Sequence, residues 1–112
     1  MSYLDAKAQC EFDGVYLAIP RSADQNAFIA SLIPHINIWI GVNDIAEEGT
    51  FAAVDGQEVT YTKWNFGEPN NWNPITGGDE DGVVVGGTNG WIVWADEEIE
   101  HQQPFVCMSN IL

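Results

Sequence analysis

Asn37-Ile38-Trp39-Ile40-Gly41-Val42 is the stretch that decides the fold. It is rich in branched and aromatic residues, and such a run favours a β-strand. Pro34 lies three residues upstream and ends the helical pattern that precedes it. The sequence therefore changes character here, from helices on the N-terminal side to short strands on the C-terminal side.

The first of two expected helices covers roughly residues 3–12. Leu4, Ala8 and Phe12 recur there at helical spacing. Gly14 breaks this pattern, and the β-rich residues 15–19 that follow predict a short strand.

The second expected helix begins at Ser22. A side chain of this type caps a helix, and Gln25 three residues later completes a capping box. The helix runs to about residue 33, and its apolar face is formed by Phe28, Ile29 and Leu32.

Short strands and turns are expected after the central strand, interrupted by a long loop at residues 65–81. This loop is rich in glycine, proline and asparagine, and a loop of such length is usually functional or disordered. The expected strands cover residues 50–54, 59–62, 82–86, 91–94 and 104–108. Two helices followed by short strands predict an α+β fold, and 112 residues fit one domain, 1–112.

The charge of the chain is strongly acidic. It has 17 Asp and Glu residues against 3 Lys and Arg, a formal net charge of −14. Such a surface repels nucleic acid and anionic membranes, so neither is an expected partner. No apolar stretch approaches the about 18 residues of a membrane span. The N-terminus shows no signal peptide, so an exported protein would begin here after its cleavage site, although a cytosolic protein would begin in the same way.

A catalytic site has little support in the sequence. The two histidines, His35 and His101, are not accompanied by a nucleophile-elbow serine, a phosphate-binding loop or zinc-finger spacing. Paired carboxylates could hydrolyse glycosides, but a short chain with one long loop offers only a shallow cleft. The chain is therefore not expected to be an enzyme.

Oxygen-bearing side chains gather around the long loop. Calcium binds six to eight oxygens from carboxylates, amides and water, so this mixture suits a calcium site. His101 beside Asp96 or Glu80 would instead suit zinc. The candidate oxygen donors are Glu68, Asn70, Asn71, Asp79, Glu80, Asp81 and Asp96.

Several motifs make the chain resemble the C-type lectin-like domain over almost its whole length. Trp39-Ile40-Gly41-Val42-Asn43-Asp44 is similar to the WIGL-type signature of that family. Glu68-Pro69-Asn70 matches the motif of its mannose-type members, and Trp94-Ala95-Asp96 stands where the family has Trp-Asn-Asp. The resemblance implies two helices, two small antiparallel sheets and a long calcium- and sugar-binding loop.

The resemblance implies a principal calcium site that also binds sugar. Glu68 and Asn70 would each bind both calcium and a sugar hydroxyl, in an order that suits mannose or glucose. Glu80 would add a third carboxylate, or Asp79 in its place because the loop is longer than in simple members. Asp96 would be a fourth ligand.

An auxiliary calcium site and the form of one peptide bond follow from the same resemblance, whereas the tryptophans are judged by their places in the sequence. The peptide bond before Pro69 is expected to be cis. Trp72 could stack on a sugar ring or cover the loop. The other tryptophans, Trp39, Trp64, Trp91 and Trp94, are expected in the core. The auxiliary ligands would be Asp44, Glu48, Asn71, Glu80 and Asp81.

The sequence departs from the family pattern in three places. Ala95 replaces an asparagine that would bind calcium and donate to the sugar, so a lower affinity is expected. Gly82 and Ile99 stand near the family's inner cysteine pair, so the implied disulfide is the long-range one between Cys10 and Cys107. The usual N-terminal strand is missing, which would leave a sheet edge open for a homodimer contact.

The implied protein is a secreted, non-enzymatic lectin. It would bind mannose- or glucose-type glycans on microbes through calcium, with a role in innate immunity and antimicrobial defence. The alternative is a lectin-like module that binds a protein or a microbial surface without calcium, with zinc in its place as one option.

Overall fold

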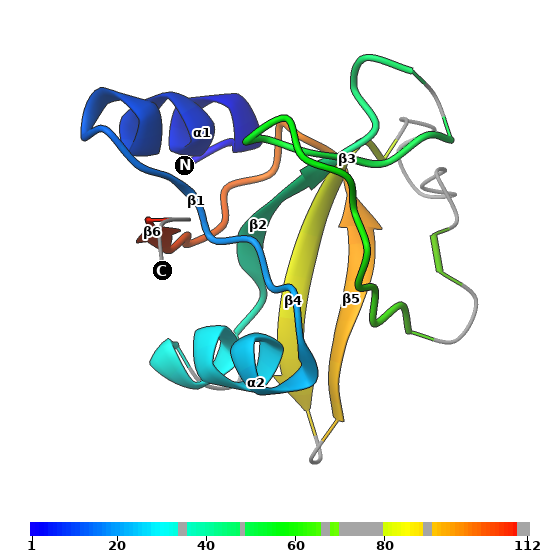
Figure 1. The fold of residues 1–112 in the computed structure, drawn as a ribbon. Coiled ribbons are helices and arrows are strands. Elements are labelled where there is room, and N and C mark those ends of the chain that lie inside the picture. The colour runs from blue at the N-terminus through cyan, green and yellow to red at the C-terminus, as the bar shows by residue number, and fades with distance from the viewer. Residues whose placement is uncertain (34–35, 48, 66–67, 70–79, 89–90, 110–112) are drawn as a thin grey trace.

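The computed structural model describes residues 1–33, 36–47, 49–65, 68–69, 80–88 and 91–109. It has the expected α+β architecture of two helices and two small antiparallel sheets (Figure 1). The four-stranded sheet has the order β3-β2-β4-β5, and β1 pairs with β6 in the other. The elements are α1 (Tyr3–Phe12), β1 (Tyr16–Leu17), α2 (Ala23–Leu32), β2 (Ile38–Asn43), β3 (Ala52–Ala53), β4 (Gly82–Thr88), β5 (Trp91–Glu97) and β6 (Cys107–Met108).

Figure 1 shows α1 and α2 near opposite ends of the larger sheet, with β1 and β6 between them. Within the described residues, neither helix is long and apolar enough to cross a membrane. The expected strand at residues 59–62 is absent, and the flanking strands are shorter or longer than expected, because pairing partners rather than local composition set their ends.

Both helices begin at the serines that cap them. Ser2 Oγ accepts a hydrogen bond from Asp5 N at 3.4 Å, and Ser22 Oγ accepts one from Gln25 N at 3.1 Å. The expected capping box is only half formed, since Gln25 Oε1 accepts from Arg21 N at 2.8 Å. The side chain of Gln25 thus satisfies the backbone N–H of Arg21, the residue before the cap.

The apolar face expected for α1 points to solvent. Leu4 is 51% exposed and Phe12 is 87% exposed. The buried face is formed by Tyr3, Ala6 and Cys10. A tyrosine can occupy the interior here because its hydroxyl donates to Val42 O at 3.2 Å.

The expected face of α2 is also largely wrong. Phe28 and Leu32 are exposed, whereas Ile29 is buried as expected. Asn26 and Ala30 complete the buried face. Spacing of apolar residues along a helix cannot identify the inner face when a polar residue finds hydrogen bonds inside the protein.

The larger sheet separates two hydrophobic clusters, and β4 contributes to both. Val83 and Val85 pack in a cluster with Ile29 of α2, Ile40 and Trp94. The side chain of Val84 points the other way, into the second cluster. That cluster contains Tyr3, Ala6, Cys10, Leu17, Trp39 and Val84. Trp39 and Trp94 are fully buried and Trp64 is partly buried, as expected, while the side chain of Trp91 lies outside the described residues.

A disulfide joins Cys10 of α1 to Cys107 of β6, over a sequence separation of 97. Side chains pack closely around Gly82, one of the two positions where an inner disulfide was expected to be absent. A Cβ on Gly82 would lie 2.8 Å from Trp39 Cζ3 and 3.3 Å from Ile99 Cγ2. A glycine is therefore required there, and the aromatic cluster occupies the space.

Candidate calcium and sugar site

Three carboxylates from separate segments form the described part of the candidate site. Asp96, next to last in β5, is 3% exposed, and Glu80, two residues before β4, is 7% exposed. Glu68 is half-buried, and the peptide bond between it and Pro69 is cis, as expected. Ala95 is half-buried and packs against the cluster that contains Tyr3 and Trp39.

Main-chain hydrogen bonds tie the Glu68 segment to β5. Trp94 N donates to Lys63 O at 2.6 Å, and Asn65 N donates to Trp94 O at 2.8 Å. Glu68 N in turn donates to Asn65 O at 2.9 Å. Glu68 is therefore held close to the part of β5 that carries Asp96.

A buried asparagine on α2 supports this arrangement. The indole Nε1 of Trp94 donates to Asn26 Oδ1 at 2.7 Å, and Asn26 Nδ2 donates to Ile92 O at 3.1 Å. The role of this residue was not predicted from the sequence. Its signal was an amide next to the apolar residues of a helix, which by itself does not identify a partner.

The three carboxylates repel one another in the absence of a cation. Burial, followed by the hydrogen bond and charge of Asp96 and by the charge of Glu80, raises the pKa of Glu68 to about 8. Burial, followed by the charges of Asp96, Glu97 and Glu98, raises the pKa of Glu80 to about 7. A divalent cation would remove this repulsion, because it favours the ionised carboxylates.

His101 faces the neighbouring glutamates rather than the expected zinc partners. Its Nδ1 lies 2.8 Å from Glu97 Oε1, and its Nε2 lies 3.4 Å from Glu98 Oε2. The side chains of these two glutamates are only 20% and 15% exposed. The two nitrogens are thus occupied by two different carboxylates, which does not resemble a zinc site on Asp96 or Glu80.

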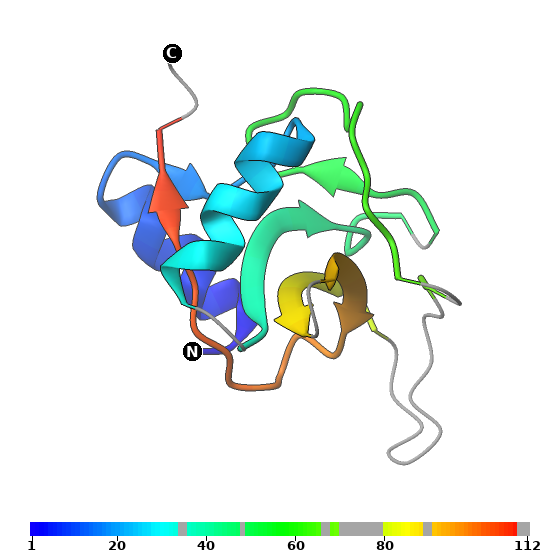
Figure 2. The ribbon, with the colours of Figure 1, turned by 90° about the horizontal axis from the view of Figure 1, so that it is seen from below.

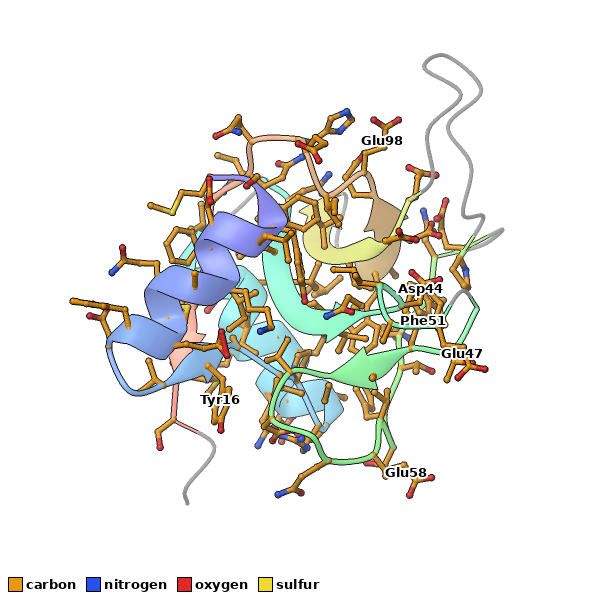
Figure 3. All side chains as sticks on the ribbon, turned by 90° about the horizontal axis from the view of Figure 1, so that it is seen from above. Tyr16, Asp44, Glu47, Phe51, Glu58 and Glu98 are labelled. Carbon is orange, nitrogen blue, oxygen red and sulfur yellow. A yellow bond between two sulfur atoms is a disulfide. The ribbon has the colours of Figure 1, made fainter. Side chains whose placement is uncertain are left out.

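Asp44 and Asp81 of the expected auxiliary site lie next to each other. Asp44 N donates to Asp81 O at 3.1 Å, and Asp44 Oδ2 accepts from Gly49 N at 2.9 Å. Asp44 is 2% exposed, and its Oδ1 is buried without a hydrogen bond from the described residues. Burial raises the pKa of Asp44, and the neighbouring Asp81 adds to this. Figure 3 shows Asp44 near Glu47 and Phe51.

The chemistry of these donors fits calcium, which prefers carboxylate oxygen. Among the residues that the structure describes, however, no group of three Asp, Glu, His or Cys side chains is placed to hold a metal ion. A calcium ion at either place would need donors from outside these residues. Asn70, Asn71, Trp72, Asp79 and Glu48 lie outside the described residues.

The sequence of residues 1–109 matches the family model of the lectin C-type domain. This chain belongs to the C-type lectin domain family. Relatives include a tetranectin-like protein of Carcharhinus perezii, 32% identical over 111 residues, and lectin BRA-3 of Megabalanus rosa, 32% identical over 110 residues. These alignments cover 95% and 96% of this chain but 63% and 65% of the relatives, so this C-type lectin domain spans less than two thirds of their length.

The fold of the C-type lectin domain is also shared with solved structures. One is the cow C-type carbohydrate-recognition domain of CD23, determined in the presence of a GlcNAc2Man3 oligosaccharide. It is 26% identical to this chain with a TM-score of 0.82, and the alignment covers 96% of this chain and 78% of that one. The two chains therefore share the C-type lectin fold over nearly the whole of this domain.

Proposed function

We propose that this domain binds mannose- or glucose-type glycans through calcium and has no enzymatic activity. The observation that carries the proposal is the convergence of Glu68, Glu80 and Asp96, with a cis peptide bond next to Glu68, in a C-type lectin fold. Asn70, one residue beyond Pro69, would complete the principal site. Asp44, Asp81, Asn71, Glu80 and Glu48 would hold an auxiliary ion, and Trp72 would contact the sugar.

The side chains of the site would both hold the ion and recognise the sugar. Calcium held by these residues would supply a positive charge that attracts the oxygens of two adjacent sugar hydroxyls. The carboxylate of Glu68 would accept a hydrogen bond from one hydroxyl, and the amide of Asn70 would donate to the other. Burial of Glu80 and Asp96 would strengthen their attraction to the ion, because charges interact more strongly away from water.

The setting that we propose is extracellular, with residues 1–112 forming one lectin domain. The disulfide between Cys10 and Cys107 fits an oxidising compartment. The net charge of −14 disfavours anionic surfaces, so neutral glycans of microbes are the partners that we infer, with a role in innate antimicrobial defence. Two copies acting together would bind repeated glycans more tightly than one.

Retention on mannan resin tests the calcium requirement. We expect the wild type to bind in calcium and to elute with EDTA, and Glu68→Gln to lose most of its retention. The matched control is Glu58→Gln, since Glu58 is an exposed carboxylate far from Asp44 and Glu98 in Figure 3. Equal retention with and without EDTA would refute calcium-dependent binding.

Exchange of the two recognition side chains tests sugar selectivity. Glu68→Gln together with Asn70→Asp reverses the order of donor and acceptor, so preference should move from mannose to galactose. The preference is measured by eluting the bound protein from the resin with free mannose or with free galactose. An unchanged preference would count against this assignment of the two residues.

A second candidate function is binding of a protein or microbial surface without calcium, with zinc as one substitute. The observation that favours it is Ala95, which offers no side-chain oxygen where the family has an asparagine. Calorimetric titration separates the two. No heat on adding calcium would favour the second function, and a response to zinc alone would favour a zinc-bound form.

A further inference from the structure

Helix α2 presents large apolar side chains to solvent. Phe28 is 57% exposed and Leu32 is 48% exposed. Gln25, Phe28 and Leu32 are spaced i, i+3 and i+7, so they lie along one face of the helix. This face is adjacent to the side on which Ile29 enters the core.

A shallow cavity adjoins this face of the helix. Gln25 is part of its lining, which also includes Tyr16, Ile19 and Met108. Arg21 lines it too, but its guanidinium is paired with Asp55 at 2.8 Å. We call the exposed side chains of Phe28 and Leu32 together with this cavity the α2 face. Figure 2 shows β6 beside α2, and Figure 3 shows Tyr16 away from the labelled acids.

The α2 face lies in the part of the chain that carries least charge. Residues 25–43 contain no acidic or basic residue apart from His35, in a chain with 17 acids. Asp24, in the first turn of α2, is the closest acid in the sequence. Two copies with a net charge of −14 repel each other, so they can approach closely only through a neutral surface.

We propose that a second copy of this chain docks on the α2 face. Each copy offers both a projecting side chain, Phe28, and a cavity on the same side of the helix. A two-fold arrangement brings each projection toward the cavity of the other copy, which is the self-complementarity that an isologous dimer requires. A basic partner would instead be drawn to the acid-rich surfaces of the molecule.

The proposed contact leaves the candidate site free. α2 lies against the beginning of β5, where Asn26 Nδ2 contacts Ile92 O, whereas Asp96 lies near the end of that strand. The separation of four positions between Ile92 and Asp96 corresponds to about 13 Å of extended chain. Binding of glycan and pairing of copies can therefore occur together.

The size of the contact predicts a weak dimer. A helix of 10 residues is about 15 Å long. With the cavity beside it, the α2 face is smaller than the about 800 Å² per partner of a standard stable interface. We expect a dissociation constant on the order of micromolar to tens of micromolar.

Sedimentation equilibrium without glycan tests this proposal. The wild type should show a monomer–dimer equilibrium, and Phe28→Asp should weaken it by about tenfold or more because it places a charge in the contact. Phe12→Asp is the matched control, since Phe12 is 87% exposed on α1, between Glu11 and Asp13, and should change nothing. Phe28→Ser, with thermal melting of each variant, separates loss of docking from loss of folding.

Reducing the charge repulsion between the copies provides a second test in the same experiment. Asp24→Asn should strengthen the dimer, and so should added salt, because both reduce repulsion between the copies. The proposal is overturned by a wild type that stays monomeric, by a dimer that persists in Phe28→Asp, by equal losses in Phe28→Asp and Phe12→Asp, or by weakening with salt. Retention on mannan is a separate readout, so failure of the dimer does not depend on failure of the lectin function.

Discussion

At the scale of single residues, the carboxyls of the candidate site make stability depend on pH. The folded protein holds the pKa of Glu68 at about 8 and that of Glu80 at about 7, both above the ordinary value of 4.5. At pH values between the ordinary pKa of 4.5 and the raised pKa of about 8, the folded state therefore binds more protons than the unfolded state. This contribution to stability is fully present below about pH 4.5 and is lost as the pH rises through 7 to 8.

We therefore expect the melting temperature in EDTA to fall between about pH 5 and about pH 8. Glu68→Gln should reduce this fall, whereas Glu58→Gln should keep it. Calcium should raise the melting temperature most at the upper end, where the carboxyls have lost their protons. A melting temperature that rises with pH in EDTA would contradict the mutual repulsion of these groups.

Asn26 is the other residue whose role can be measured. Asn26→Ala leaves the indole N–H of Trp94 and the carbonyl of Ile92 without their partner, which should cost about 1–3 kcal/mol of unfolding free energy. Urea unfolding measures the loss, with the exposed Ser31→Ala on the same helix as control. Equal midpoints for the two variants would show that these hydrogen bonds contribute little.

At the scale of elements, β2 depends on a glycine because other segments approach it closely. A Cβ on Gly41 would lie 2.6 Å from Leu17 O and 2.7 Å from Ile19 Cγ1. Gly41→Ala must therefore push the segment after β1 away, at a cost of about 1–3 kcal/mol or more. Thermal melting checks this against Gly14→Ala, where space is open but the positive φ of 78° is strained. A smaller loss for Gly41→Ala than for Gly14→Ala would contradict close packing as the dominant effect.

The sequence predicted which elements exist better than it predicted their orientation. Helix α2 begins after Ser22, as predicted, because a cap is a local interaction. The inner faces of both helices were mistaken because Tyr3 and Asn26 are buried through hydrogen bonds to Val42 and Trp94, which are distant in the sequence. The spacing of apolar residues along a helix carries no information about such distant partners.

The candidate site, too, was predicted only in part. Its motif nominated Glu68, Glu80 and Asp96, because calcium chemistry restricts which side chains are useful. The hydrogen bonds between Trp94 and the segment before Glu68 join main-chain groups. They could not be predicted from the sequence, because almost every residue type carries these groups. The motif could therefore supply the donors but not the connection that holds them together.

At the scale of the whole molecule, one disulfide ties the two ends of the chain. The loop that it closes spans a separation of 97 residues. Restricting a loop of this length in the unfolded state is worth roughly 4–5 kcal/mol. Replacing both Cys10 and Cys107 by serine should lower the unfolding free energy by about 2–5 kcal/mol, measured by urea titration. An unchanged midpoint would show that packing of α1 against the sheet suffices without the bond.

The placement of α2 and Asp96 at opposite ends of β5 also decides how a pair of these molecules would engage a cell. Two domains joined through α2 would point their sites away from each other. Such a pair would bind two separate particles, because its two sites could not both reach the same surface. Yeast or mannan-coated beads would then clump at protein concentrations that favour the dimer, and Phe28→Asp would coat them without clumping.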